Sequence, residues 1–180
     1  MGLDLAAGGF CGVVLAGGTA ARMDGVDKAS VELAGRSLLE YAVDAFLDAA
    51  EVVVVGPDTV RTARPVTFVV EDPPRGGPVA GLLTGVDALL RAPRLVGVLA
   101  VDMPRVTPAT MRRLREAATG RDGAFLVGGD GRRQLAGVLD AARAGGAGPC
   151  RAAPPGRVVR RRAGLRRAPR PAAAGRRHPP

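Results

Sequence analysis

The stretch that decides the fold lies near the amino end and reads Leu15-Ala16-Gly17-Gly18-Thr19-Ala20-Ala21-Arg22-Met23-Asp24-Gly25-Val26-Asp27-Lys28. It continues the apolar run 11–16, which has the composition of a short buried strand. Gly17 and Gly18 carry no Cβ, so backbone N–H groups at this point can approach an anion closely. Two cations, Arg22 and Lys28, follow at fixed spacing. A strand that ends in such a loop is suited to bind phosphate.

Neither common nucleotide fingerprint occurs in this loop. The pattern G-x-G-x-x-G fails because Gly17 and Gly18 are adjacent and no third glycine stands in place, and the chain has no G-K-[ST] motif. On the glycine pair alone, an ordinary turn between a strand and a helix, with a solvated arginine and lysine, is the competing interpretation.

Outward from this loop, strand-like and helix-like segments alternate as far as Leu139. Apolar or β-branched runs predict strands at 11–16, 52–55, 66–70, 95–101, 124–127 and 134–139. Start signals and helical spacing predict helices at 37–50, where Ser37 and Glu40 match a capping box, at 78–90, and from Pro108 onward after a Thr107 N-cap. This alternation predicts an α/β fold with a Rossmann-like, doubly wound, mostly parallel sheet, in which ligands bind beyond the carboxyl ends of the strands.

Composition excludes several classes of site. The 180 residues suffice for one domain. With 3% aromatic residues and no tryptophan, a stacking platform for single-stranded nucleic acid is not expected. One histidine, His178, and two cysteines, Cys11 and Cys150, leave no material for Ser-His-Asp catalysis, a zinc ribbon or a disulfide framework. A catalytic metal would have to be a hard ion held by carboxylates, and Cys11 is expected to be a small core residue.

Charge divides the chain at about residue 140. Residues 1–140 hold 15 Lys+Arg and 17 Asp+Glu, a net charge of −2, whereas residues 141–180 hold 11 Arg and no acid, a net charge of +11. Alanine, arginine, glycine and proline make up 35 of these last 40 residues, so we expect a folded domain at 1–140 and a disordered basic tail at 141–180. Two origins stay open for the tail: an out-of-frame reading of a GC-rich gene, or a basic arm that binds nucleic acid non-specifically.

The opening stretch resembles the L-A-G-G-x-x-x-R-M-x-G-x-D-K signature of the molybdenum cofactor guanylyltransferases, the MobA-like nucleotidyltransferases. The likeness continues through the segments Gly35–Glu40, Glu71-Asp72, Gly77-Pro78-Val79-Ala80-Gly81 and Val101-Asp102-Met103-Pro104. It runs from about Gly12 to Leu139 and stops before the strand and helix that close the family's domain. The resemblance therefore implies a family member whose C-terminal part is missing or frameshifted.

The resemblance implies a reaction and the residues for it. The family transfers GMP from GTP to molybdenum-molybdopterin, forming the guanine dinucleotide cofactor and pyrophosphate. By the same resemblance Arg22, Lys28 and Asp102 are the catalytic groups, the two cations neutralising the triphosphate. The nucleotide contacts it implies are the backbone from Leu15 through Ala16 and Gly17 to Gly18, together with Lys28, Asp72 and Asp102. Gly56 falls where the family usually has a polar nucleotide contact, so its role stays open.

Asp102 is also a candidate metal ligand on independent grounds. It follows an apolar run directly, so it should emerge at the carboxyl edge of the sheet, where Mg²⁺ would be bound, and Pro104 stops the strand from continuing. The competing interpretation is an aspartate that merely starts a turn. Asp27 has two readings as well: it shapes the turn, or it orients the neighbouring Lys28 ammonium.

The family resemblance also bears on the nucleotide, the acceptor and further partners. Related enzymes that transfer CMP typically read L-A-A-G where this chain has Leu15-Ala16-Gly17-Gly18, which favours GTP. The alternatives are CTP, a sugar-phosphate acceptor, or a non-catalytic protein whose arginine-rich tail binds nucleic acid. Molybdoenzymes or their chaperones are the further partners that the resemblance implies. The apolar run 10–16 is too short to span a bilayer, so a cytoplasmic protein is expected.

Overall fold

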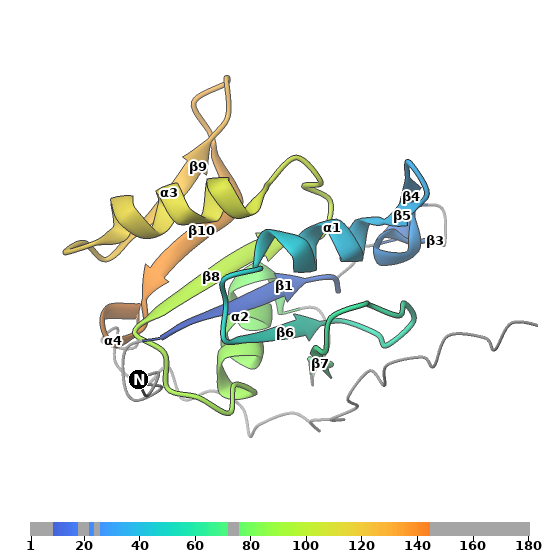
Figure 1. Ribbon diagram of the computed structural model, residues 1–180, viewed down its shortest axis with the longest axis horizontal. Helices are drawn as coiled ribbons and strands as arrows, with labels where there is room; N and C mark the ends of the chain where they lie inside the picture. The colour runs from blue at the N-terminus through green and yellow to red at the C-terminus, as the bar shows by residue number, and fades with distance from the viewer. Residues whose placement is uncertain (1–8, 18–21, 24–25, 72–75, 145–180) are drawn as a thin grey trace, which may run out of the picture.

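The computed structural model describes residues 9–17, 22–23, 26–71 and 76–144 (Figure 1). Its six-stranded sheet contains β1 (Phe10–Leu15), β6 (Glu51–Val55), β7 (Thr67–Val69), β8 (Leu95–Ala100), β9 (Gly123–Val127) and β10 (Arg133–Asp140). The helices are α1 (Leu38–Ala45), α2 (Gly77–Asp87), α3 (Pro108–Ala118) and α4 (Ala141–Ala144), with a 3₁₀ turn η2 (Lys28–Ser30). Two short antiparallel pairs complete the described elements: β2 (Arg22–Met23) with β3 (Val26–Asp27), and β4 (Glu32–Leu33) with β5 (Arg36–Ser37).

The sheet has the order β7-β6-β1-β8-β10-β9, in which the first four strands are parallel and β10 runs antiparallel to both of its neighbours. Helices α1 and α3 lie on one face and α2 on the other, as Figure 1 shows. This confirms the expected doubly wound, mostly parallel α/β sheet. The division into a domain at 1–140 and a tail stays a prediction, since residues 145–180 lie outside the described part. The first residues of the predicted tail, 141–144, instead form α4, and Ala141 N–H donates to Arg94 O at 2.8 Å.

Each face of the sheet has its own core, because successive strand residues point to opposite sides. Val14, Val54 and Leu99 pack with α1 and α3. Their neighbours Val13, Val53 and Val55 pack against the α2 side. Runs such as Val52–Val55 are therefore buried on both faces, which explains why they are apolar without alternation.

Helix α1 begins as expected and ends earlier. Ser37 and Glu40 form the predicted capping box, but the helix stops at Ala45, not Ala50. Phe46 is fully buried, and the chain turns there with Phe46 N–H donating to Val43 O. The Arg64 guanidinium donates to the carbonyls of Phe46 and Ala49, which replaces helical partners for these groups. The apolar periodicity of 46–50 thus reports burial in a turn, not a longer helix.

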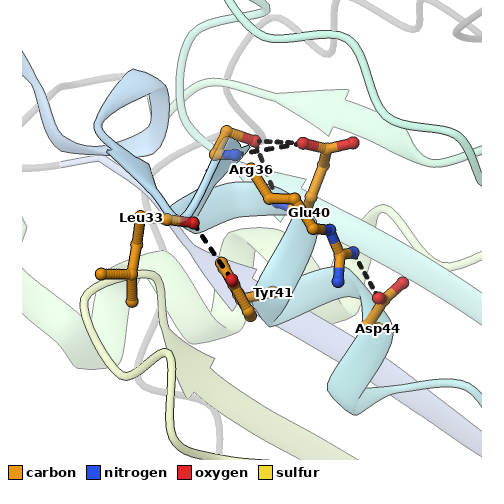
Figure 2. A network of polar contacts seen from close by, with 6 residues as sticks. Leu33, Arg36, Glu40, Tyr41 and Asp44 are labelled. Carbon is orange, nitrogen blue, oxygen red and sulfur yellow. Dashed lines mark hydrogen bonds and ion pairs between the residues drawn. The ribbon is translucent and has the colours of Figure 1, made fainter.

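The β4–β5 hairpin is fastened to the start of α1 by side chains (Figure 2). The Tyr41 hydroxyl donates to Leu33 O at 3.0 Å, and the Arg36 guanidinium lies 4.9 Å from the centre of the Tyr41 ring and donates to Asp44. The hydrogen bond to Asp44 and the negative charge of its carboxylate raise the pKa of Arg36 above its ordinary value. The chain that follows η2 is therefore anchored to a helix that packs on the core.

Candidate nucleotide site

Three parallel strands end level with one another at the carboxyl edge of the sheet. Leu15, the last residue of β1, lies opposite Val55 on one side and Ala100 on the other. The loops that leave this edge begin at Ala16, Gly56 and Val101, so the glycine stretch and Asp102 emerge side by side as the sequence predicts. This is where open α/β sheets bind ligands.

Gly56 allows the first two of these loops to touch. A Cβ on Gly56 would lie 2.9 Å from the carbonyl carbon of Ala16 and 3.1 Å from Gly17 N. Ala16 N–H donates to Val55 O at 2.8 Å, and Gly56 N–H donates to Val69 O at 2.8 Å. A side chain at position 56 would push the glycine stretch away from the sheet. The polar contact that the family usually places here is therefore replaced by close backbone packing.

Lys28 is presented by a turn that Asp27 caps. Asp27 Oδ1 accepts from Ala29 N–H at 3.1 Å, the Ser30 hydroxyl donates to Asp27 O at 2.8 Å, and Ala29 is buried in the core beneath. Asp27 Oδ2 accepts from the Thr59 hydroxyl. The Asp27 carboxylate therefore shapes the turn, and the other reading, a direct contact with the Lys28 ammonium, is not what the structure shows.

The ammonium of Lys28 donates to Asp102 Oδ2 at 3.0 Å across 74 positions of sequence. The Lys28 side chain is 18% exposed and that of Asp102 is 49% exposed. An ion pair this open to solvent stabilises a fold by at most about 1 kcal/mol. Stability is thus a weak reason for the pair, whereas a cation and a carboxylate at the ligand-binding edge can both act on a bound phosphate.

The loop that carries Asp102 is fixed by its backbone and by the core. Val101 N–H donates to Leu15 O at 3.1 Å, and Met103 N–H donates to Ala100 O at 3.3 Å. Val101 and Val106 are buried on either side of the acid. The Thr107 cap and Pro108 then start α3, as the sequence predicts.

The G-P-V-A-G segment forms the first turns of α2. Glu71 reaches this point from beyond β7, and its Oε2 accepts from Gly76 N–H at 3.2 Å. A Cβ on Gly81 would lie 2.7 Å from Glu71 Oε1 and 3.2 Å from Leu15 Cδ2, so a larger residue there would displace the Glu71 carboxylate. Glu71 therefore connects the end of the β7 region to the start of α2, directly under the strand that leads to the glycine stretch.

The predicted site residues fall into three groups. Leu15, Ala16, Gly17, Lys28 and Asp102 gather at the carboxyl edge. Arg22 lies in β2, paired through the backbone with Asp27, and its side chain is outside what the structure describes. Gly18 and Asp72 lie outside the described residues.

Two further residues complete the account of the site. Cys11 is buried in β1 as expected, and burial raises the pKa of its thiol, which keeps it protonated and unreactive.

Thr59, which donates to Asp27, is not predicted from the sequence, because a lone threonine in a loop gives no sequence signal.

A magnesium site would rest on few protein ligands. Within the described residues, no group of three or more His, Cys, Asp or Glu side chains gathers to hold a metal. Asp102, half exposed and at the ligand edge, fits the usual Mg²⁺ arrangement, in which one or two carboxylates share the ion with substrate phosphates and water.

An open α/β sheet with a glycine loop, a lysine and an aspartate at its carboxyl edge defines a nucleotide-binding domain of the nucleotidyltransferase type. The model of the MobA-like NTP transferase domain matches residues 12–173, and the chain belongs to this family. The match extends past Leu139, where the motif-by-motif resemblance ends. Among the described residues, each helix is too short to cross a membrane.

Curated relatives carry a common description. The chain is 34% identical over 121 residues to a probable molybdenum cofactor guanylyltransferase of Natronomonas pharaonis, a match that covers 63% of this chain and 59% of the relative. It is 36% identical over 136 residues to a protein of the same description from Opitutus terrae, covering 73% and 67%. The chain thus spans about three fifths to two thirds of the length of these two curated relatives.

Solved structures share the fold. Rv0371c from Mycobacterium tuberculosis aligns with a TM-score of 0.57 at 19% identity, covering 74% of this chain and 71% of that one. The molybdopterin-guanine dinucleotide biosynthesis protein A from Archaeoglobus fulgidus aligns with a TM-score of 0.52 at 20% identity, covering 74% and 68%. At these identities the likeness concerns the fold, which agrees with the sheet order described above.

Proposed function

We propose that this chain transfers GMP from GTP to molybdenum-molybdopterin and releases pyrophosphate. The observation that carries the proposal is the contact between Lys28 and Asp102, which brings a cation and a carboxylate together at the carboxyl edge beside Gly17. The similarity to two probable molybdenum cofactor guanylyltransferases supports the choice of reaction. Molybdoenzymes or their chaperones would then receive the product. We also propose that the reaction takes place in the cytoplasm.

The reaction is a displacement at the α-phosphorus of GTP. An oxygen of the acceptor's terminal phosphate forms a bond to that phosphorus, and the bond to the bridging oxygen of the β-phosphate breaks, so pyrophosphate leaves with the bonding electrons. The protein needs no covalent nucleophile, because positioning and charge neutralisation supply most of the catalysis in phosphoryl transfer.

The described residues divide this work. Leu15 O accepts from Val101 N–H, and Ala16 N–H donates to Val55 O, so both groups are already used at the sheet edge. We therefore assign the phosphate contact to the next described N–H group, that of Gly17. The Lys28 ammonium neutralises charge that develops on the departing pyrophosphate. Asp102 would hold Mg²⁺, which when bound neutralises phosphate charge.

The residue type at position 28 strengthens this assignment. Lys28 is the single lysine of the chain, and every other residue among its 26 Lys+Arg is an arginine. A lysine here is therefore not a consequence of composition. Its compact ammonium acts as a point charge, so it can pair with the Asp102 carboxylate without substrate and with a phosphate oxygen when the nucleotide is bound.

Calorimetry tests the guanine assignment. The 180-residue chain should bind GTP in the presence of Mg²⁺ more tightly than CTP or ATP, and Asp102→Asn should weaken binding of the magnesium complex. Equal affinity for the three nucleotides would remove the guanine assignment, and a preference for CTP would point to the cytidylyl alternative.

A further inference from the structure

The loop between β6 and β7 contacts two parts of the segment that runs from Leu15 to Lys28, which we call the nucleotide loop. Gly56 packs against Ala16 and Gly17 at one end. The Thr59 hydroxyl donates to the Asp27 carboxylate at the other end, immediately before Lys28. The nucleotide loop is therefore supported at both ends by one neighbouring loop.

Thr59 is itself held in place. Val60, the next residue, is partly buried and packs on the main core, whereas Thr59 is exposed. Gly56 N–H is bonded to Val69 O at the start of the same loop. The hydroxyl is thus delivered to Asp27 by a segment fixed at two points.

We propose that Thr59 is a positioning residue for the reaction, and that its hydrogen bond to Asp27 sets the turn from which Lys28 reaches Asp102. Asp27 has two carboxylate oxygens with separate tasks: Oδ1 accepts from Ala29 N–H inside the turn, and Oδ2 accepts from Thr59 outside it. Without the outer contact the carboxylate is free to rotate, and the cap that fixes the backbone of Lys28 weakens. This inference rests on the proposed function of Lys28.

The kinetic test compares two threonines. Thr59→Val removes the hydroxyl while keeping the shape, and Thr62→Val is the matched control because Thr62 donates to Arg64 O within its own loop. Loss of one solvent-exposed hydrogen bond predicts a fall in kcat of roughly five- to tenfold for Thr59→Val, with a smaller change in KM for GTP. Thr59→Ser keeps the donor and should restore kcat. Both valine variants should unfold at nearly the same temperature as the unmodified chain.

A second readout does not depend on turnover. Since Lys28 is the only lysine, reductive methylation with ¹³C-formaldehyde labels one ε-amine in the chain, besides the terminal amine. The ¹³C-methyl resonance of Lys28 should shift in Thr59→Val in the same direction as in Asp102→Asn, and stay in place in Thr62→Val. In the Asp27→Ala background, Thr59→Val should add nothing further.

The outcomes separate the two proposals. An unmodified chain that neither binds GTP nor forms dinucleotide refutes the proposed function, and the Lys28 resonance then still decides whether Thr59 sets the turn. A chain that is active, with Thr59→Val and Thr62→Val alike in kcat and in the Lys28 resonance, overturns the role of Thr59 and leaves the proposed function standing.

Discussion

The two loops that meet at the site are held by different kinds of interaction. The turn at Lys28 has one backbone hydrogen bond, from Val31 N–H to Lys28 O, and one buried residue, Ala29. Its other hydrogen bonds are made by the side-chain oxygens of Asp27, Thr59 and Ser30. The loop at Asp102 depends on backbone hydrogen bonds and on two buried valines, Val101 and Val106. Polar changes near Lys28 should therefore alter the reaction at little cost in stability, whereas apolar changes near Asp102 should alter stability with little effect on the reaction.

The largest expected effect comes from the two charged groups themselves. Lys28→Ala should lower kcat by about 10²–10³-fold, the loss typical of one strong electrostatic contact in the transition state, with a smaller effect on GTP affinity. Asp102→Asn keeps the size of the side chain but loses the charge that binds a hard cation, so high Mg²⁺ or Mn²⁺ should restore part of its activity.

Steady-state kinetics at several metal concentrations separate these two variants. Metal should not rescue Lys28→Ala. If Asp102→Asn binds metal and turns over like the unmodified chain, Asp102 only forms a turn, and Asp72 becomes the next candidate for the metal.

A substitution at the buried Val106 tests whether apolar changes in the Asp102 loop alter stability without altering the reaction. Val106→Ala removes two methyl groups from a side chain that is 5% exposed, which should lower the free energy of unfolding by roughly 2 kcal/mol. Its kcat, measured well below the melting temperature, should match that of the unmodified chain because backbone bonds still hold the Asp102 loop.

Chemical denaturation and kinetics on the same preparations provide the measurement. Val79→Ala is the matched control, since Val79 is 71% exposed and should lose almost no stability. A Val106→Ala variant that keeps its stability and loses activity would reverse the proposed division between the loops.

The smallest effect is expected from an ion pair away from both loops. Arg112 on α3 donates to Asp48, with Nε at 2.6 Å from Oδ2 and Nη2 at 3.0 Å from Oδ1. This hydrogen bonding lowers the pKa of Asp48 below its ordinary value of 3.8. The pair's contribution to the free energy of unfolding is therefore fully present above pH 3.8. It is lost as the pH falls through the lower pKa that Asp48 has in the folded state.

Replacing Arg112 with glutamine should therefore cost a little stability at neutral pH, and the difference from the unmodified chain should vanish in acid. Arg113→Gln, on the adjacent exposed residue, is the control. Melting curves recorded from pH 7 downward check this, and a difference that grows in acid would contradict the sign. Neither variant should change kcat.

Most of the sheet and helices could be predicted because their signals are local. Buried runs such as Val52–Val55 and caps such as Ser37 and Thr107 act within a few residues. The end of α1 could not, because it depends on Phe46 being buried and on Arg64, 18 positions away, taking its carbonyl. The β4–β5 hairpin could not be predicted either, since its turn places Ala34 at a φ of 52°, where asparagine or glycine is the usual signal.

Several residues that lie at the carboxyl edge could be named from the sequence, but their contacts could not. Motifs identified Lys28 and Asp102 separately, and the strand positions implied that both lie at one edge. That the two side chains touch depends on the register of β1 with β8, which no local pattern encodes. The support from Thr59 depends on how a third loop packs, and a single hydroxyl in that loop has no periodicity or motif to mark it.

Transfer of label from the nucleotide tests the central claim most directly. The 180-residue chain is incubated with Mg²⁺, molybdenum-molybdopterin and GTP labelled at the α-phosphate, and the pterin fraction is separated and counted. We expect label to enter a pterin dinucleotide and unlabelled pyrophosphate to be released in equal amount. Labelled CTP should not substitute for GTP, and Lys28→Ala should abolish most of the transfer. Label that stays in GTP, or that enters the pterin equally well from CTP or with Lys28→Ala, would contradict it.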